Sequence, residues 1–290
     1  MSEAGGGQGA FGANRRYAAS LMRALLGAMI FALPLTMTLE MWELGVTMRP
    51  WRLAGLLAAT FPMLVALSFY AGFEATFSLL DNVLDAFAAM AVAAASCLAV
   101  LALFGAITPG MTIEEIVGKL AVLSFAASIG ALLADKQFND DASREDARSP
   151  QHGFGSRLFV MAVGAIFLAL NVAPTDEVEI IATNISPLQA VLLSLVSLAV
   201  LYATVIVADP ATRRASLGCR VRRGMAGYGI CLALASGVLW LFGRLDGVAI
   251  DEAAECIIVL GFPAALGAGA ARLILGDTSG GETSEAPHGA

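Results

Sequence analysis

The chain has 290 residues, of which 58% are hydrophobic and 14% are charged, and its formal net charge at pH 7 is −7. Soluble domains carry about 25% charged residues, so this composition and a mean hydropathy of +0.77 exclude an ordinary soluble protein. We therefore predict an all-α membrane protein, because a helix satisfies its own backbone in lipid and the apolar runs lack a barrel's alternation.

Eight apolar runs are each long enough to cross about 30 Å of hydrocarbon as a helix. We predict a disordered N-terminal tail (1–17), a first transmembrane repeat (18–135), a cytoplasmic linker (136–156), a second transmembrane repeat (157–275) and a disordered C-terminal tail (276–290). The predicted spans are 20–42, 53–73, 84–107 and 114–134 in the first repeat, and 157–174, 187–208, 224–243 and 252–275 in the second.

The first span ends in two acids, Glu40 and Glu43, where a helix of about 20 residues would still be crossing the bilayer. Glu40 is therefore predicted to lie within the outer leaflet or just beneath its headgroups. Two interpretations stay open. The carboxylate either takes part in a cation site or is an interfacial group that reaches water beside Trp42 and Trp51.

The fourth span begins with the run Thr112–Glu115, which fits a capping box: the Thr hydroxyl caps the amide of Glu115, whose side chain bonds back. The eighth span begins with Ala249 in place of the threonine but keeps two acids, Asp251 and Glu252. Acids at a helix N-terminus are favoured by the helix dipole. Because they persist without the capping residue, a role beyond capping is also considered.

Two further charges, Lys119 and Glu255, lie inside the fourth and eighth spans. Lys119 either pairs with Glu115 on its own helix, since residues four apart face each other, or meets Glu255 across the two repeats. The second arrangement would be an intramembrane ion pair that fixes how the repeats dock.

Charge on the loops predicts the orientation of the protein in the membrane. Of the 17 Lys and Arg residues, only Arg49, Arg52 and Arg244 fall on the side opposite the termini, and Lys119 lies inside a span. The positive-inside rule therefore places both termini in the cytoplasm. The acids give the outer face an excess of negative charge, which either attracts cations or reflects only that acids, unlike Lys and Arg, are tolerated on that side. The basic segment 213–223 is topogenic and too close to the bilayer for a nucleic-acid partner.

An offset of 137 residues brings the two groups of spans into register. Gly27 meets Gly164, Glu40 meets Glu177 and Pro50 meets Pro187. The match continues into the last span of each group, where identical residues include Ile113 and Ile250, Glu115 and Glu252, Phe125 and Phe262, and Gly130 and Gly267. We predict an internal duplication of four parallel spans, related by a pseudo-two-fold axis along the membrane normal, with spans 3 and 7 as its weakest match.

No motif points to catalysis. The two histidines, His152 and His288, lie in the linker and the tail, so an intramembrane His-ligated haem or metal site is excluded, and no HExxH, Ser-x-x-Lys or phosphate-binding glycine loop occurs. We expect no enzyme and no cofactor.

Two functional hypotheses follow. The first is a cation channel or transporter with an acidic outer vestibule; the second is a non-transporting assembly or interaction protein with a solidly packed core. The lipid bilayer is the expected partner, small cations are the candidate ligands, and the oligomeric state and the metal stay open. The candidate cation-binding residues are Glu40, Glu177, Glu115, Glu252, Glu114 and Asp251, and the candidate intramembrane ion pair is Lys119 with Glu255.

The stretch RALLGAMIFALPLTMTLEMWELG (Arg23–Gly45), together with LLADKQF (Leu132–Phe138), resembles a family of bacterial integral membrane proteins of about this length. The similarity covers residues 15 to 275. It implies a multi-pass protein of the bacterial inner membrane. The family carries no assigned activity, so the resemblance transfers no site residues.

Overall fold

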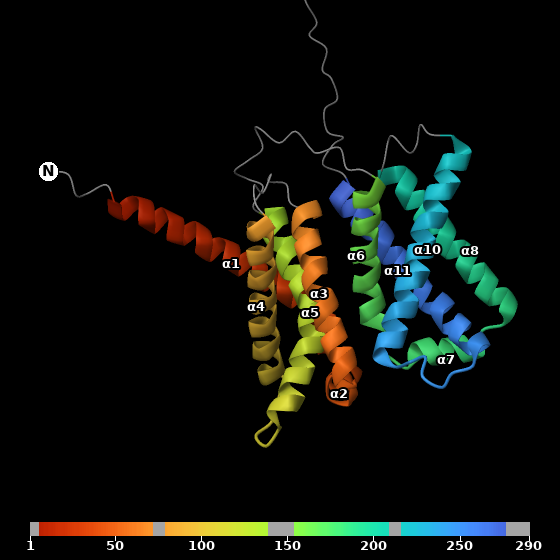
Figure 1. The fold of residues 1–290 in the computed structure, drawn as a ribbon, viewed down its shortest axis with the longest axis horizontal. Helices are drawn as coiled ribbons and strands as arrows, with labels where there is room; N and C mark the ends of the chain where they lie inside the picture. The colour runs from red at the N-terminus through yellow and green to blue at the C-terminus, as the bar shows by residue number, and fades with distance from the viewer. Residues whose placement is uncertain (1–5, 72–78, 139–153, 209–215, 277–290) are drawn as a thin grey trace, which may run out of the picture.

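The computed structural model describes residues 6–71, 79–138, 154–208 and 216–276, and this part of the chain forms helices and connecting turns (Figure 1). The helices are α1 (Gly6–Thr36), α2 (Leu39–Thr47), α3 (Pro50–Ala71), α4 (Leu79–Leu103), α5 (Ile113–Phe138), α6 (Phe154–Val172), α7 (Glu177–Asn184), α8 (Pro187–Ala208), α10 (Leu217–Phe242) and α11 (Ile250–Gly276). The all-helical prediction is confirmed for these residues.

The sequence-based boundaries agree with the structure at some ends and not at others. The helix α8 has the predicted bounds, 187–208, whereas α1 already begins at Gly6, inside the segment predicted as a disordered tail. Most of the predicted linker (139–153) and nearly all of the C-terminal tail (277–290) lie outside the described residues. Within the described residues seven helices are long and apolar enough to cross a membrane, and the number of spans rises to eight if α1 and α2 count as one.

The first predicted span is broken. The apolar part of α1 ends at Thr36, and α2 leaves it at an angle of 88°. Pro34 lacks an N–H and removes one hydrogen bond from the last turns of α1, which favours an end there. In the second half α6 ends at Val172 and the short helix α7 follows, but α6 is by itself long and apolar enough to cross a membrane (Gly155–Val172). Neither short helix was predicted as a separate element.

One helix of each half occupies the centre of its bundle. In the membrane-spanning window, 78% of the residues of α5 and 56% of those of α11 are buried, against 22% for α8. The helix α1 packs along α5, and α6 packs along α11. On the outer helices large apolar side chains such as Ile30, Leu84 and Leu192 are exposed, as expected for surfaces that face lipid.

Glycines permit the closest of these helix contacts. A Cβ atom built on Gly27 or on Gly130 would overlap the carbonyl oxygen of the other residue, so α1 and α5 touch backbone to backbone. Gly164 and Gly267 make the same contact between α6 and α11. Small residues at membrane helix crossings allow this approach, and van der Waals packing then holds the helices together.

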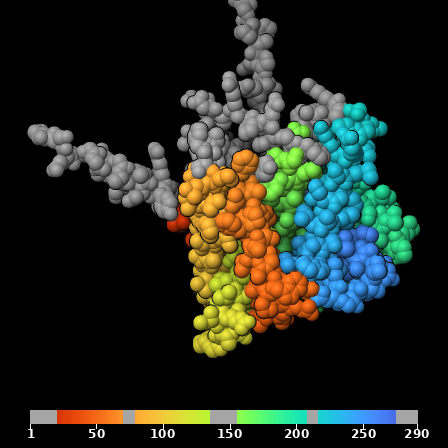
Figure 2. All heavy atoms as spheres, viewed as in Figure 1, coloured from red at the N-terminus to blue at the C-terminus, as the bar shows by residue number. Residues whose placement is uncertain are grey.

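The helix α3 of the first half lies beside α6 and α10 of the second (Figure 2). The halves also meet where α1 contacts α6, since the rings of Phe31 and Phe167 have centroids 4.6 Å apart. The rings of Trp51 on α3 and Trp240 on α10 have centroids 5.5 Å apart. The helix α8 packs on α10 and α11 and lies at the far edge of the second half (Figure 1), with Leu188 70% exposed. The pseudo-two-fold relation between the halves stays a prediction.

Candidate functional site

The predicted site residues gather at one end of the molecule, which we call the acidic end. It consists of α2, α7, the turn 104–112 and the loop 243–249 (Figure 1). The first turns of α5 and α11, which carry the acid pairs, start from this end.

The capping box at the start of α5 is formed as predicted. A carboxylate oxygen of Glu115 accepts hydrogen bonds from the Thr112 amide (2.7 Å) and the Thr112 hydroxyl (3.1 Å). The Glu115 amide lies 3.3 Å from the Thr112 hydroxyl oxygen. The Glu115 carboxylate therefore caps the N-terminus of its own helix, which reduces its availability as a cation ligand.

The corner between α1 and α2 is held by polar side chains that satisfy the last carbonyls of α1. The hydroxyl of Thr36 donates to Leu33 (3.0 Å) and that of Thr38 donates to Leu35 (2.9 Å). The indole N–H of Trp42 donates to the carbonyl of Thr36 at 3.0 Å. Carbonyls at a helix end have no intrahelical donor, so these bonds lower the free-energy cost of breaking the helix in an apolar setting.

Lys119 is buried (6% exposed) and binds within its own half. Its ammonium donates to the carbonyl of Ala106 at 2.9 Å and lies 5.9 Å from the centre of the Trp42 ring. Within the described residues Lys119 forms no ion pair with Glu255, because the turn before α5 supplies a nearer acceptor. The lysine thereby ties the turn 104–112 to α2.

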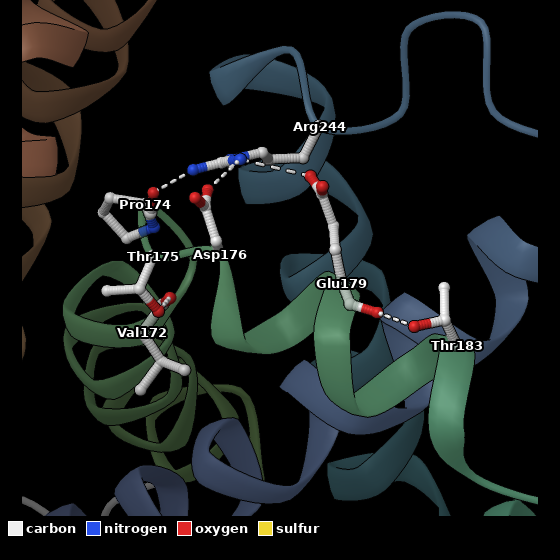
Figure 3. Close-up of polar contacts among 7 residues, drawn as sticks. All are labelled: Val172, Pro174, Thr175, Asp176, Glu179, Thr183 and Arg244. Atoms are coloured by element: carbon white, nitrogen blue, oxygen red, sulfur yellow. Dashed lines mark hydrogen bonds and ion pairs between the residues drawn. The ribbon is translucent and has the colours of Figure 1, made fainter.

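In the second half Arg244 has the corresponding position between a loop and a corner (Figure 3). It donates to the carboxylates of Asp176 (2.9 Å) and Glu179 (3.2 Å) and to the carbonyl of Pro174. The hydroxyl of Thr175 donates to Val172 at 2.8 Å, which satisfies a carbonyl at the end of α6. These contacts fasten the loop 243–249 to the corner between α6 and α7.

A second arginine, Arg52, joins the two halves. Arg52 on α3 is buried (5% exposed) and donates to Asp246 at 2.7 Å, while its guanidinium lies 5.0 Å from the Trp51 ring centre. Hydrogen bonding to Arg52, with the charges of Arg52 and Arg49, holds the pKa of Asp246 below its ordinary value. Gly243 has φ +81° and leaves room for the guanidinium where a Cβ would collide with it.

The remaining predicted acids do not join these contacts. Glu40 and Glu252 are half-buried, and Glu114 and Asp251 are exposed; in the described part of the chain these four have no hydrogen-bond or ion-pair partner. Glu177 is exposed on α7. No group of three or more His, Cys, Asp or Glu side chains among the described residues is placed to hold a metal ion. A shared cation site therefore stays a prediction.

A separate polar cluster lies towards the opposite end of the first half, between α3 and α4. The hydroxyl oxygen of Ser68 lies 2.9 Å from the amide oxygen of Asn82 and 3.1 Å from a carboxylate oxygen of Asp85. Ser68 is fully buried, Asn82 is 1% exposed and Asp85 is half-buried. We call these three residues the Ser68 cluster.

Comparison with known proteins identifies the family. Residues 20–275 match the family described as "Putative integral membrane protein (DUF2391)". The chain belongs to the DUF2391 family. This confirms the resemblance seen in the Arg23–Gly45 segment. No curated protein and no solved structure matches this DUF2391 chain.

Ser68 and Asp85 of this DUF2391 protein lie inside the predicted second and third spans, whereas Asn82 lies just before the third span, which was predicted to begin at residue 84. The helix α4 begins five residues earlier, at Leu79, and carries Asp81, Asn82 and Asp85. The Ser68 cluster was not predicted. A usable signal was the spacing of Asn82 and Asp85, which places both on one helical face.

Proposed function

We propose that this DUF2391 protein is a non-transporting membrane protein with a solidly packed helical core that serves in assembly with other membrane components. The observation that carries the proposal is the backbone-to-backbone contact of α1 with α5 and of α6 with α11 at paired glycines. Such contacts, with a continuous cluster of buried apolar residues around α5 and α11, suit a rigid body.

The acidic end supports the same proposal. Three of its acids are bound by arginines: Asp246 by Arg52, and Asp176 and Glu179 by Arg244. A fourth, Glu115, caps its own helix. These carboxylates hold loops and corners in place, which is a structural task.

We further infer that the chain is an internal duplication, and local hydrogen bonds support this. The hydroxyl of Thr38 donates to Leu35 at the end of α1, and Thr175, 137 residues later, donates to Val172 at the end of α6. The bounds of α3 and α8 are also 137 residues apart at both ends. A single ancestral unit of four spans, with a short helix after the first span, accounts for these matches.

We also propose that both termini lie in the cytoplasm of a bacterial cell and that the protein has no enzymatic activity. The first proposal rests on the placement of Lys and Arg, which leaves Arg49, Arg52 and Arg244 at the acidic end. The second rests on the lack of any catalytic motif in the sequence.

Cation transport is the second candidate function, because four acids of the acidic end have no partner in the described residues. These are Glu40, Glu114, Asp251 and Glu252. Unpaired carboxylates suit hard cations, and together with Glu177 they could concentrate such ions at the membrane surface.

A flux assay separates the two functions. Purified protein in liposomes should pass Na⁺, K⁺, Ca²⁺, Mg²⁺ and protons no faster than protein-free liposomes do. The variants Glu40→Gln and Glu177→Gln should behave like the wild type. A cation flux that either substitution lowers would replace the assembly proposal with transport.

The assembly function makes its own measurable claim. Membranes extracted directly into native nanodiscs should contain a discrete complex larger than the monomer mass of 29.9 kDa, seen by native mass spectrometry. Monomers alone would contradict the assembly proposal, whatever the flux assay gives.

A further inference from the structure

Positive charge gathers at the end of the second half that lies opposite α7 (Figure 1). We call this end, formed by the start of α6, the start of α10 and the end of α11, the basic end. Every described arginine of the second half except Arg244 belongs to it: Arg157, Arg220, Arg222, Arg223 and Arg272. The described acids of the second half all lie at the acidic end or in the first two turns of α11.

Two of these arginines have no partner among the described residues. Arg220 is half-buried, and its Nε atom is shielded from solvent without a hydrogen-bond acceptor. Arg222 is exposed. Arg157, Arg223 and Arg272 each have a further interaction, so only Arg220 and Arg222 are open to a ligand. A buried donor of a charged group that lacks an acceptor is costly, and an anion at this place would remove that cost.

Arg220 lies on the face of α10 that turns to α6 and α8. Gly224 and Gly227 share this face, because they follow four and seven residues later. A Cβ atom on Gly224 would lie 3.3 Å from the ring of Tyr202 on α8. A Cβ atom on Gly227 would overlap the side chain of Met161 on α6. Arg220 therefore lies where three helices converge, which explains how its Nε atom is kept from water.

The length of α10 brings both arginines to the level of lipid headgroups. Trp240 is 50% exposed near the other end of α10 and marks one membrane interface, because tryptophan rings favour that depth. Arg220 precedes Trp240 by 20 residues and Arg222 precedes it by 18. At about 1.5 Å a residue these stretches span about 30 and 27 Å, close to the hydrocarbon thickness of about 30 Å. Both guanidinium groups therefore reach the phosphates of the opposite leaflet.

A row of exposed apolar side chains accompanies the two charges. Leu217, Val221 and Met225 follow at four-residue steps along one face of α10 and are 63%, 43% and 60% exposed. Arg222 is exposed beside Val221, and arginine side chains extend from such a position to the headgroups. One phospholipid offers both a phosphate for the arginines and acyl chains for this apolar row.

We propose that Arg220 and Arg222 bind the phosphate of an anionic phospholipid at the basic end. A guanidinium donates parallel hydrogen bonds to phosphate oxygens, and the buried Nε atom of Arg220 gains an acceptor there. The positive dipole end of α10 adds to the attraction, and the side chain of its N-cap Ser216 forms no capping bond. Two unpaired cations favour a lipid with net negative charge, such as phosphatidylglycerol, over a zwitterionic one.

The test uses the full-length protein in detergent micelles, titrated with phosphatidylglycerol or with phosphatidylcholine of the same acyl chains and followed by native mass spectrometry. We expect the anionic lipid to bind about tenfold more tightly or better, because each arginine near an anionic lipid contributes roughly fivefold. Inorganic phosphate forms a second arm. It shares the anionic group but has no acyl chains, so it should not displace the lipid.

Variants assign the binding to the two arginines. Arg220→Gln and Arg222→Gln should each weaken binding of phosphatidylglycerol about fivefold or more and leave binding of phosphatidylcholine unchanged. Arg222 is exposed, so its variant keeps the test decisive if Arg220→Gln does not fold. Arg148→Gln is the matched control, because it removes the same charge from the predicted linker, outside the described residues. Arg220→Lys keeps the charge but loses Nε and the planar set of donors, so it should weaken binding as well.

Three results would overturn the proposal. Equal affinity of the wild type for both lipids removes the preference for negative charge. A preference that both Gln variants retain, that Arg220→Lys leaves unchanged, or that Arg148→Gln lowers equally shows diffuse attraction in place of a site. Displacement of the lipid by inorganic phosphate shows that the ligand is a free anion. The proposal goes beyond the assembly function and does not depend on it, because a lipid bound to one chain requires no protein partner and no flux.

Discussion

Adding one methyl group at Gly130 should destabilise the protein, although alanine normally favours a helix. A Cβ on Gly130 would lie 2.5 Å from the carbonyl oxygen of Gly27 and would also overlap the side chain of Phe31. An ordinary contact begins at 3.4 Å, so α1 and α5 must separate by about 0.9 Å. The helices cannot avoid this by a rotamer change, because one partner is backbone.

The magnitude follows from the dispersion contacts along that crossing. A separation of this size forfeits a quarter to a half of each contact, and roughly fifty contacts of about 0.15 kcal/mol then lose about 2–4 kcal/mol. Alanine returns about 1 kcal/mol through its helix propensity. The net cost of Gly130→Ala is therefore about 1–3 kcal/mol, or about 3–10 °C in Tm.

The matched control is Gly55→Ala on α3, where a new Cβ would meet nothing within 4 Å. That variant should unfold at the wild-type temperature or slightly above it. Both variants are compared in the same detergent by tryptophan fluorescence. If Gly130→Ala is as stable as Gly55→Ala, α1 and α5 do not touch backbone to backbone. The argument for a rigid core, which rests on that contact, then fails.

Three further predictions concern the acidic end. In the folded protein the pKa of Asp246 lies below its ordinary value of 3.8. Its contribution to stability is therefore present above pH 3.8 and is lost as the pH falls through the lowered pKa. Arg52→Gln should reduce this loss, seen as a flatter curve of Tm against pH in that range. Thr112→Ala should lower Tm by about 2–4 °C through loss of the capping box, and Ala249→Thr should raise it, because it creates the missing cap on α11; unchanged Tm values would contradict the capping role. A cysteine at Gly247, in the loop 243–249, should react with a membrane-impermeant maleimide from outside intact cells, and labelling only after lysis would reverse the topology.

The approximate positions of seven of the eight predicted spans agree with the described helices, because the bilayer imposes a length and a composition on each span. The bounds of α8 agree at both ends, since Pro187 starts the helix and the whole segment is apolar. The start of α4 does not agree, because Asp81 and Asn82 interrupt the apolar run before residue 84, whereas in the fold Asn82 is buried beside Ser68. Burial of polar groups depends on partners distant in the chain, and sequence periodicity carries no record of those partners.

The break after Thr36 was also beyond prediction, although its components are visible in the sequence. Hydropathy continues through Met37 and Leu39, so a window sees one span. The break depends on Thr38 and Trp42 bonding back to the carbonyls of α1, and each bond needs the corner to exist first. The bonds and the corner form together, so neither can be predicted from the sequence without the other. As a result Glu40 lies on a short separate helix, α2, and not on a continuous first span.

Under the inferred duplication, the two halves solve one structural problem with different residues. In the first half a lysine from α5, Lys119, binds the carbonyl of Ala106 and holds the preceding turn near α2. In the second half an arginine from the loop itself, Arg244, binds Asp176 and Glu179 at the start of α7. Alignment of the repeats could not detect this equivalence, because the cations lie at unrelated positions. The acids that alignment does match, Glu40 with Glu177, belong to neither fastening. The acids that are matched between the repeats therefore do not hold the two corners, and the residues that do hold them differ between the halves.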